Sequence, residues 1–213
     1  MIKIKQSTKI AAAAFLLLAL SSCSTLISVI ATPKVNAEFG ELKSGQYSLD
    51  KSHAALIFKI QHMGLSTYVG RFNVLSAELD FDPSNIESIN LTADVEISSL
   101  DINDEELKDD LMGRSWFNQA QYPIARVSTQ KVEKLKDGLI LLTLNLDWRG
   151  VRKPIEMTAT FHGGANNVLT GKYTLGFSSC GSFNRSDFGM KQFIPLVGDE
   201  VVLEAFGEFQ KSQ

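Results

Sequence analysis

The stretch that decides the fold is LILLTLNLDW-RG-VRKPIEMTATF, residues 139–161. In its second half apolar side chains take every other position, at Ile155, Met157, Ala159 and Phe161. In its first half one face is wholly apolar and consists of Ile140, Leu142, Leu144, Leu146 and Trp148. A period of two is typical of a β-strand with one buried face, because successive side chains point to opposite sides. The stretch therefore predicts two strands.

The same period recurs through most of the chain. It predicts further strands at residues 54–61, 68–81, 89–97, 124–132, 168–177 and 201–209. Within residues 68–81 the apolar parity changes between Val74 and Leu75, which predicts a β-bulge. Residues 103–113 are the one convincing helical segment, and their many charges indicate a solvated face. We therefore expect an all-β fold, an antiparallel barrel of about eight strands with a short helical insertion.

The composition fits one globular domain of this kind. The 213 residues are 44% hydrophobic and 21% charged, which argues against disorder. The formal net charge of −3 gives no indication of the basic surface that a nucleic-acid-binding protein needs. Thirteen of the aromatic residues are Phe, which has no polar group and belongs in a core or against an apolar ligand.

The N-terminal region is typical of an export signal. Three lysines precede an unbroken apolar run from Ile10 to Leu20, which is too short to span a membrane alone. Leu20-Ser21-Ser22-Cys23 follows at once and resembles a bacterial lipobox, in which the cysteine is acylated and becomes the mature N-terminus. Two alternatives remain: ordinary cleavage after Val35-Asn36-Ala37, or one uncleaved anchor from Ile10 to Ala31.

The lipobox interpretation divides the chain into three parts. Residues 1–22 form a lipoprotein signal peptide, residues 23–45 an acylated N-terminus and polar tether, and residues 46–213 the barrel domain. Loss of three lysines with the signal changes the formal charge from −3 to −6. We expect a location in the bacterial cell envelope, on the periplasmic side and lipid-anchored, with a soluble periplasmic or secreted protein as the alternative. Cys180 is then left without a partner and is expected to be a small buried hydrophobe, with a Cys23–Cys180 bridge as the competing interpretation.

Several short segments carry a resemblance to a known family. They are Tyr47-Ser-Leu-Asp50-Lys-Ser-His53, Phe58, His62-Met-Gly64, Gly70-Arg-Phe72, Asp80-Phe81-Asp82, Asp110-Leu111, Trp116-Phe117, Tyr122-Pro123, Leu144, Gly150-Val151, Pro154 and Arg185-Ser186-Asp187-Phe188-Gly189. In this order and spacing they cover residues 46–210, and the chain resembles the YceI-like family of lipid- and polyisoprenoid-binding domains. The resemblance implies a lipocalin-like barrel with an elongated apolar cavity, in an exported binding protein rather than an enzyme. The lipobox departs from the plain signal peptide of many members.

Strand parity gives candidates for a lipid-binding cavity wall. They are Phe58, Phe72, Leu142, Leu144, Trp148, Phe161, Phe177 and Phe188. His62 shares the parity of Phe58, so it is either a satisfied histidine at the strand end or a contact to a ligand head group. Arg185 is either half of a structural ion pair with Asp187 or a partner for a phosphate or carboxylate head. Asp50 and His53 are expected to pin the chain where the first strand begins.

Other kinds of site find little support in the sequence. His53 and His62 lie nine residues apart, on opposite faces of a regular strand, so no metal site and no cofactor is expected. No catalytic motif of a lipid hydrolase or phosphate-binding enzyme occurs. We therefore expect a membrane-tethered protein that binds a long-chain amphiphile such as a polyisoprenoid, a quinone-type lipid or a fatty acid. A lipid-acting enzyme and a fully packed interaction barrel are the alternatives, and the sequence leaves a homodimer open.

Overall fold

The computed structural model describes residues 33–136 and 138–212. The expected signal peptide and Cys23 therefore lie outside the described residues. Within these two ranges no helix combines the length and the hydropathy that a membrane crossing requires.

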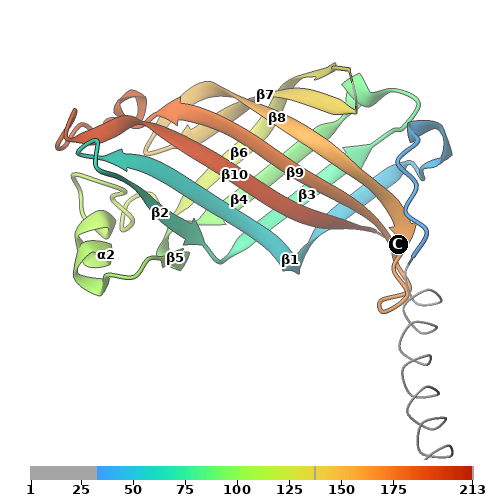
Figure 1. Cartoon of the computed structure of the whole chain (residues 1–213), viewed down its shortest axis with the longest axis horizontal. Helices are drawn as coiled ribbons and strands as arrows, with labels where there is room; N and C mark the ends of the chain where they lie inside the picture. The colour runs from blue at the N-terminus through green and yellow to red at the C-terminus, as the bar shows by residue number, and fades with distance from the viewer. Residues whose placement is uncertain (1–32, 137, 213) are drawn as a thin grey trace, which may run out of the picture.

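Eight antiparallel strands close into a barrel, as the alternating pattern predicts (Figure 1). Around the barrel the order is β1-β10-β9-β8-β7-β6-β4-β3, and β3 pairs with β1 again to close the ring. These strands are β1 (Gly45–His62), β3 (Leu75–Phe81), β4 (Asn90–Glu96), β6 (Ile124–Lys134), β7 (Leu139–Trp148), β8 (Val151–Asn166), β9 (Tyr173–Asn184) and β10 (Val197–Lys211). Every pairing is antiparallel, which the short connections between successive strands allow.

The remaining elements lie outside this ring or connect its strands. They are β2 (Ser66–Phe72), β5 (Leu100–Asp101), the α-helix α2 (Glu105–Met112) and four short 3₁₀ segments, η1 (Phe39–Glu41), η2 (Ile86–Ser88), η3 (Ile97–Ser99) and η4 (Arg185–Phe188). The side chain of Asp104 caps α2 by accepting from the backbone N–H of Leu107 at 3.0 Å. The acidic side chains of α2 are exposed, as its charge pattern predicts, and Leu111 is buried.

Strand β1 changes partners along its length. Residues 45–48 pair with β3, whereas residues 56–62 pair with β2. On its other edge β1 pairs with β10. There Leu49 pairs with Phe209 and Ala54 pairs with Gly207, so β1 advances by five residues while β10 advances by two. Residues 50–53 therefore form a wide bulge opposite Glu208.

This bulge keeps one face of β1 turned inward. Before it the inward positions are odd-numbered, at Tyr47 and Leu49, and after it they are even-numbered, at Leu56, Phe58 and Ile60. A regular strand would have turned the second set outward, because side chains alternate with a period of two.

Two sequence expectations differ from this fold. Residues 68–81 are not one bulged strand but belong to two strands, β2 and β3, that pair with different neighbours. The predicted bulge is therefore wrong. The change of apolar parity in the sequence marks the connection between the two strands at Asn73 and Val74. The expected strand at residues 168–177 begins only at Tyr173, because residues 167–172 form the turn between β8 and β9. In that turn Val168 and Leu169 are exposed.

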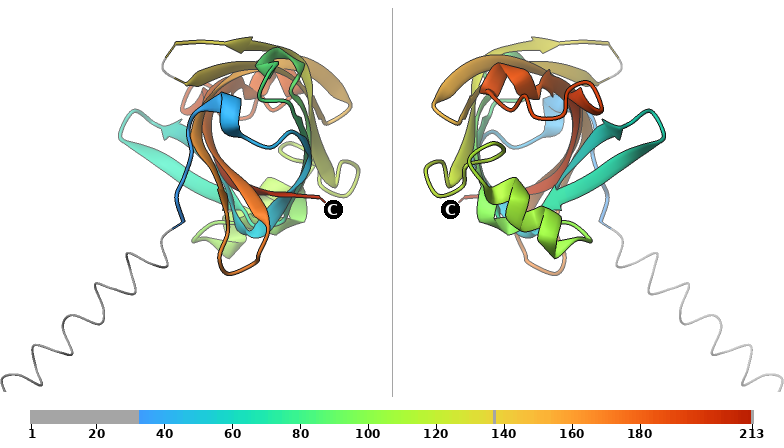
Figure 2. Two further views of the ribbon diagram at one scale, coloured as in Figure 1. Left: turned by 90° about the vertical axis from the view of Figure 1, so that its right-hand side faces the viewer. Right: turned by 90° about the vertical axis from the view of Figure 1, so that its left-hand side faces the viewer.

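Residues 33–44, expected as part of a polar tether, pack against the barrel instead. Asn36 pairs with Gly164 of β8 through two backbone hydrogen bonds of 3.0 and 2.8 Å, and Leu42 is buried. Segment η1 lies across one end of the barrel, which Figure 2 shows in its left view. The apolar Phe39 and Leu42 explain the packing, since each loses exposed area there.

Candidate functional site

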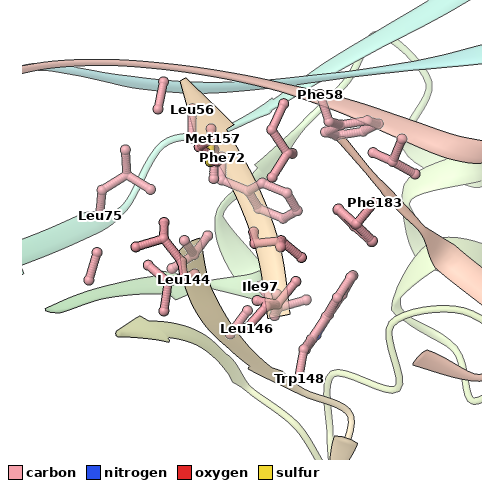
Figure 3. Close-up of a pocket in the computed structure, with 18 of the residues that line it drawn as sticks. Leu56, Phe58, Phe72, Leu75, Ile97, Leu144, Leu146, Trp148, Met157 and Phe183 are labelled. Carbon is pink, nitrogen blue, oxygen red and sulfur yellow. The ribbon is translucent and has the colours of Figure 1, made fainter. Parts of the chain in front are cut away.

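The barrel encloses a cavity of about 870 Å³. Its wall consists almost entirely of apolar side chains from the inward faces of the strands, and Figure 3 shows them pointing toward one another. The interpretation of a fully packed barrel is therefore wrong. A volume of this size lies near the top of the range of about 300–1,000 Å³ that is typical of small-molecule sites.

A cluster of aromatic rings closes one end of the cavity. Phe81 and Phe161 have ring centroids 6.2 Å apart, and Phe177 lies 5.1 Å from Phe161. Phe39 of η1 stacks on Phe161 from outside at 5.1 Å. We call these four rings the floor. Phe177 lines the cavity at this end, and the other three rings pack behind it.

The opposite end of the cavity is framed by exposed residues. The exposed lining residues at this end include His62, Arg114, Gln192 and Phe193, together with Asp110 of α2 and Gly113 and Ser115 just after it, and we call this end the mouth. The right-hand view of Figure 2 faces the mouth, where α2, the β1–β2 hairpin and the chain after β9 lie around the barrel end. Leu107 and Leu111 of α2 also line the cavity, so this helix covers part of the mouth.

Most of the predicted wall residues do lie in the wall. Lining positions are taken by Phe58, His62, Phe72, Leu142, Leu144, Trp148, Phe177 and Arg185. Phe161 belongs to the floor and Phe188 packs behind Trp148, with ring centroids 6.2 Å apart, so neither of these two faces the cavity. His62 is exposed at the mouth, where β1 ends.

Arg185 is buried at the mouth with its charge directed at backbone oxygens. Only 2% of the residue is exposed. Nε donates to the carbonyl of Gly198 at 2.7 Å, and the terminal nitrogens donate to the carbonyls of Met190, Gln192 and Val197 at 2.9, 2.8 and 3.0 Å. The guanidinium also lies 5.1 Å from the ring centroid of Trp116. Burial lowers the pKa of Arg185, and Asp199 acts in the opposite direction.

These contacts decide between the two interpretations of Arg185. The predicted ion pair with Asp187 is wrong, because Asp187 lies 3.6 Å from Lys153 instead. The bonded carbonyls belong to the chain between η4 and the start of β10, so Arg185 holds that loop in place. Its engaged donors are not directed at a ligand head group.

One polar atom in the wall has no partner among the described residues. The indole Nε1 of Trp148 is buried without a hydrogen bond, and so is Nε of the neighbouring Arg149. The ring of Trp148 lies among Phe117, Phe183 and Phe188. A buried N–H group without an acceptor costs about 1–3 kcal/mol.

The bulge in β1 holds a small polar cluster on the outside of the barrel. His53 Nδ1 lies 2.9 Å from Oδ2 of Asp50, and Gln210 donates to the same oxygen at 2.6 Å. The backbone N–H of Ser52 donates to Oδ1 of Asp50 at 3.0 Å. Glu208 lies beside this pair, and the three ionisable groups could approach one metal ion. Since Asp50 already bonds His53, Gln210 and the backbone of Ser52, the evident role of Asp50 and His53 is to fix the bulge rather than the strand start.

The remaining candidate residues lie away from the cavity. His162 is exposed on the outer face of β8, where Nε2 lies 2.8 Å from the hydroxyl of Ser178. Cys180 is exposed on β9, so the expectation of a buried cysteine is wrong. Its cross-strand partners are Thr158 and Glu204, which leave the outer surface there polar. Cys23, the other cysteine, lies outside the described residues.

Sequence reasoning missed part of the wall. The missed lining residues include Leu56, Leu75, Ile97, Leu107, Trp116, Met157 and Phe183. Met157 and Leu56 share the parity of predicted wall residues, so the alternation could have found them. Leu107 and Trp116 belong to the helical insertion and the loop after it, for which strand parity gives no signal.

The chain is similar to proteins of one family. Residues 47–209 match the model of the YceI-like domain. A UPF0312 protein of Yersinia pestis is 30% identical over 166 residues, which cover 77% of this chain and 85% of that protein. BcnA of Burkholderia cenocepacia superposes with a TM-score of 0.68 at 20% identity, over 75% of this chain and 98% of BcnA. A polyisoprenoid binding domain from Saccharophagus degradans, implicated in plant cell wall breakdown, superposes with a TM-score of 0.61 at 15% identity, over 80% of this chain and 100% of that domain.

Proposed function

Because the chain belongs to the YceI-like domain family, we propose that it binds one long-chain amphiphilic lipid inside its barrel. The observation that carries the proposal is the cavity of about 870 Å³ with apolar walls from the barrel strands. The polyisoprenoid-binding neighbour supports the same ligand class, and quinone-type lipids or fatty acids share the chemistry that the wall selects.

The energetics favour a tail rather than a head as the source of affinity. Each methylene moved from water into an apolar site contributes about 0.8 kcal/mol. A fifteen-carbon tail thus offers roughly 10 kcal/mol before the cost of ordering the ligand. A single hydrogen bond from a head group adds only about 1 kcal/mol. Affinity should rise with tail length until the tail reaches the floor.

The arrangement of polar groups gives the ligand a direction. The floor is aromatic, whereas His62, Arg114 and Gln192 lie at the mouth. A tail pointing to the floor leaves its head at the mouth, where polar groups and water can solvate it. A ligand oxygen within reach of Trp148 Nε1 would also satisfy that unpaired donor. The role proposed is therefore binding rather than catalysis.

We also propose that the barrel is exported and held at a bacterial membrane by acyl chains on Cys23. The support is the order of the N-terminal sequence, in which a basic start and an apolar run lead directly to Leu20-Ser21-Ser22-Cys23. The formal charge of −6 after loss of the signal makes attachment through basic patches unfavourable.

The binding proposal is tested by filling the cavity. Ala159 lines the cavity with 4% exposure, and the neighbouring Thr158 is exposed on the outside of the same strand. Ala159→Phe places a ring inside the barrel, whereas Thr158→Phe is the matched control outside it. Residues 33–213 suffice for the assay, since the described barrel lies within them and the BcnA chain aligns over 98% of its own length.

The measurement is displacement of a fluorescent conjugated fatty acid by polyprenols of increasing length. We expect the unmodified barrel and Thr158→Phe to bind with affinity that rises with tail length. Ala159→Phe should bind at least about tenfold more weakly, because the ring displaces several methylenes from the cavity. Circular dichroism confirms that both variants fold. Equal binding by a folded Ala159→Phe variant, or no binding by the unmodified barrel, contradicts the proposal.

A further inference from the structure

Five large apolar side chains are exposed beside the mouth. They are Met63, Leu65, Phe193, Ile194 and Leu196, and we call them the apolar tip. Met63 and Leu65 lie in the turn between β1 and β2, and the other three lie in the loop before β10. Leu65 is 83% exposed and Leu196 is 58% exposed. Large apolar side chains in such numbers on adjacent loops are typical of an interaction surface.

The two loops of the apolar tip form one surface. The backbone N–H of Met63 donates to the carbonyl of Leu196 at 2.6 Å, and His62 pairs with Val197 where the strands meet. Arg185 fixes the second loop by its four bonds to backbone carbonyls. The tip is therefore held in a defined arrangement and does not depend on a partner to order it.

The backbone of the apolar tip is strained at two positions. Met63 has φ of 54° and Phe193 has φ of 61°, in the left-handed region that residues other than glycine rarely adopt. Such conformations persist where the surrounding structure imposes them, and they gather at functional sites. At Met63 the tight hairpin turn between β1 and β2 requires this conformation, since Gly64 beside it has φ of 68° and the N–H of Leu65 donates to the carbonyl of His62 at 3.0 Å. The turn thereby holds Met63 and Leu65 at the tip with their side chains exposed.

The apolar tip is continuous with the cavity. Phe193 and Val197 of the second loop line it, as does His62 at the start of the first loop. Val168 and Leu169, which are just as exposed in the β8–β9 turn, have no such connection and line no part of the cavity.

The charges on and beside the two loops indicate which kind of partner the apolar tip suits. Residues 61–66 and 189–197 carry only His62 and Lys191 as ionisable side chains. Beside them α2 presents the exposed acidic residues Glu105, Glu106, Asp109 and Asp110. An apolar surface whose one permanently charged side chain is Lys191, with acidic neighbours on α2, suits a zwitterionic lipid bilayer, into whose interface apolar side chains insert, better than it suits an anionic bilayer.

Resting on the proposed lipid binding, we propose that the apolar tip inserts into a lipid bilayer and places the mouth against it for ligand uptake and release. The cavity then joins the hydrocarbon region without exposing the tail of the ligand to water. The tip acts on the rate of exchange with a membrane, whereas the wall of the cavity decides the affinity for the ligand.

The experiment separates these two quantities. Leu65 and Leu196 belong to the tip but do not line the cavity, so the variant Leu65→Gln/Leu196→Gln leaves the wall intact. The matched control is Val168→Gln/Leu169→Gln at the other end of the barrel. Both are made in the chain of residues 33–213, and each is measured for partition onto phosphatidylcholine vesicles and for transfer of a fluorescent fatty acid between vesicles.

Compared with the control, the tip variant should have a partition constant at least about tenfold lower, because two apolar side chains no longer enter the interface. We expect its rate of fatty-acid transfer between vesicles to fall by a similar factor. Its equilibrium affinity for the fatty acid in solution should equal that of the control. Adding phosphatidylserine to the vesicles should weaken partition.

Three results would overturn the inference. One is equal partition by the tip variant and its control, and another is partition that needs phosphatidylserine. The third is a dimer of the unmodified barrel that the tip variant abolishes, without partition onto vesicles, since the tip would then bind a second copy. If lipid binding itself fails while partition holds, the proposed function is wrong, but membrane insertion of the tip stands.

Discussion

The ring of Phe39 stacks on the ring of Phe161 with centroids 5.1 Å apart and planes inclined by 22°. Phe39 lies in the segment that precedes the first strand, whereas Phe161 belongs to β8 and to the floor. The chain on the N-terminal side of the barrel thus closes the end of the cavity opposite the mouth. A contact outside the barrel sheet thus supports the floor.

Removing Phe39 should therefore weaken the floor, so that the ring of Phe161 can shift outward and a longer tail can enter. For Phe39→Ala we expect the free energy of unfolding to fall by about 1–3 kcal/mol, since an aromatic stack and its buried area are lost. The preferred polyprenol should become longer, as the competition assay with a length series would measure. Val168→Ala is the control and should change stability by less than about 0.5 kcal/mol. An unchanged length preference in a folded Phe39→Ala variant would show that Phe39 does not limit the cavity.

The Asp50–His53 contact should give a bell-shaped contribution to stability against pH. Hydrogen bonding to His53 lowers the pKa of Asp50, and the same bond, with the field of Glu208, raises the pKa of His53. The histidine term is complete below its ordinary pKa of about 6.5 and is lost as the pH rises through the raised value. The aspartate term is complete above its ordinary pKa of about 3.9 and is lost as the pH falls through the lowered value.

Both terms are present between roughly pH 4 and pH 6.5. The difference in Tm between the unmodified protein and His53→Gln should be largest in that window and smaller on the alkaline side. Differential scanning calorimetry over a pH series measures it. His162→Gln, which removes an exposed histidine that contacts the hydroxyl of Ser178, serves as the control. A Tm difference for His53→Gln that stays constant across the whole pH range would contradict this account of the bulge.

Arg185 should be among the most sensitive positions in the barrel. Arg185→Met leaves four backbone carbonyls without their donors, and we expect the free energy of unfolding to fall by about 3 kcal/mol. Arg185→Lys should rescue little, because one ammonium cannot reproduce the planar fork of donors. Urea unfolding measures both variants, and full stability of Arg185→Lys would falsify the carbonyl-bonding role. Lys153→Met, which removes only the partner of Asp187, should change stability by less than about 0.5 kcal/mol.

Attachment through Cys23 predicts a membrane-bound protein that one substitution releases. In cells that produce the full chain, fractionation should find the unmodified protein with the membranes. Cys23→Ala should be found in the soluble fraction or remain as unprocessed precursor, because the acyl chains that anchor stably in pairs or more are absent. Cys180→Ala should leave the distribution unchanged. Membrane association of a processed Cys23→Ala protein would rule out acylation as the anchor.

The alternation of apolar residues predicted the barrel fold and most of the wall candidates, because the inward face of a strand repeats every second residue whatever the barrel contains. On that ground Leu142, Leu144 and Trp148 are candidates for the wall, and the structure places them there. Parity failed where the chain changes partner or bulges. The break at Asn73 looked like a bulge, and the true bulge at residues 50–53 looked like the start of a strand.

The floor and the mouth could not be predicted by the same means. Phe161 has the parity of a wall residue, but its neighbours from η1 and β3 make it part of the floor. The charge of Arg185 suits a carboxylate, but its hydrogen-bond partners are backbone carbonyls. They lie in an irregular segment whose conformation cannot be predicted from hydrophobic periodicity. Long-range contacts of this kind depend on the closed barrel, so the sequence near each residue holds no trace of them.

The central claim is that the barrel holds one long-chain amphiphile, and the most direct test is the mass of what the native protein carries. The full chain is expressed in a bacterial host, extracted in mild detergent and examined by native mass spectrometry, followed by lipid identification. We predict a species heavier than the protein by one lipid with a long tail, which is absent from the Ala159→Phe variant. A protein of unmodified barrel mass that takes up no polyprenol, quinone-type lipid or fatty acid afterwards would contradict the account.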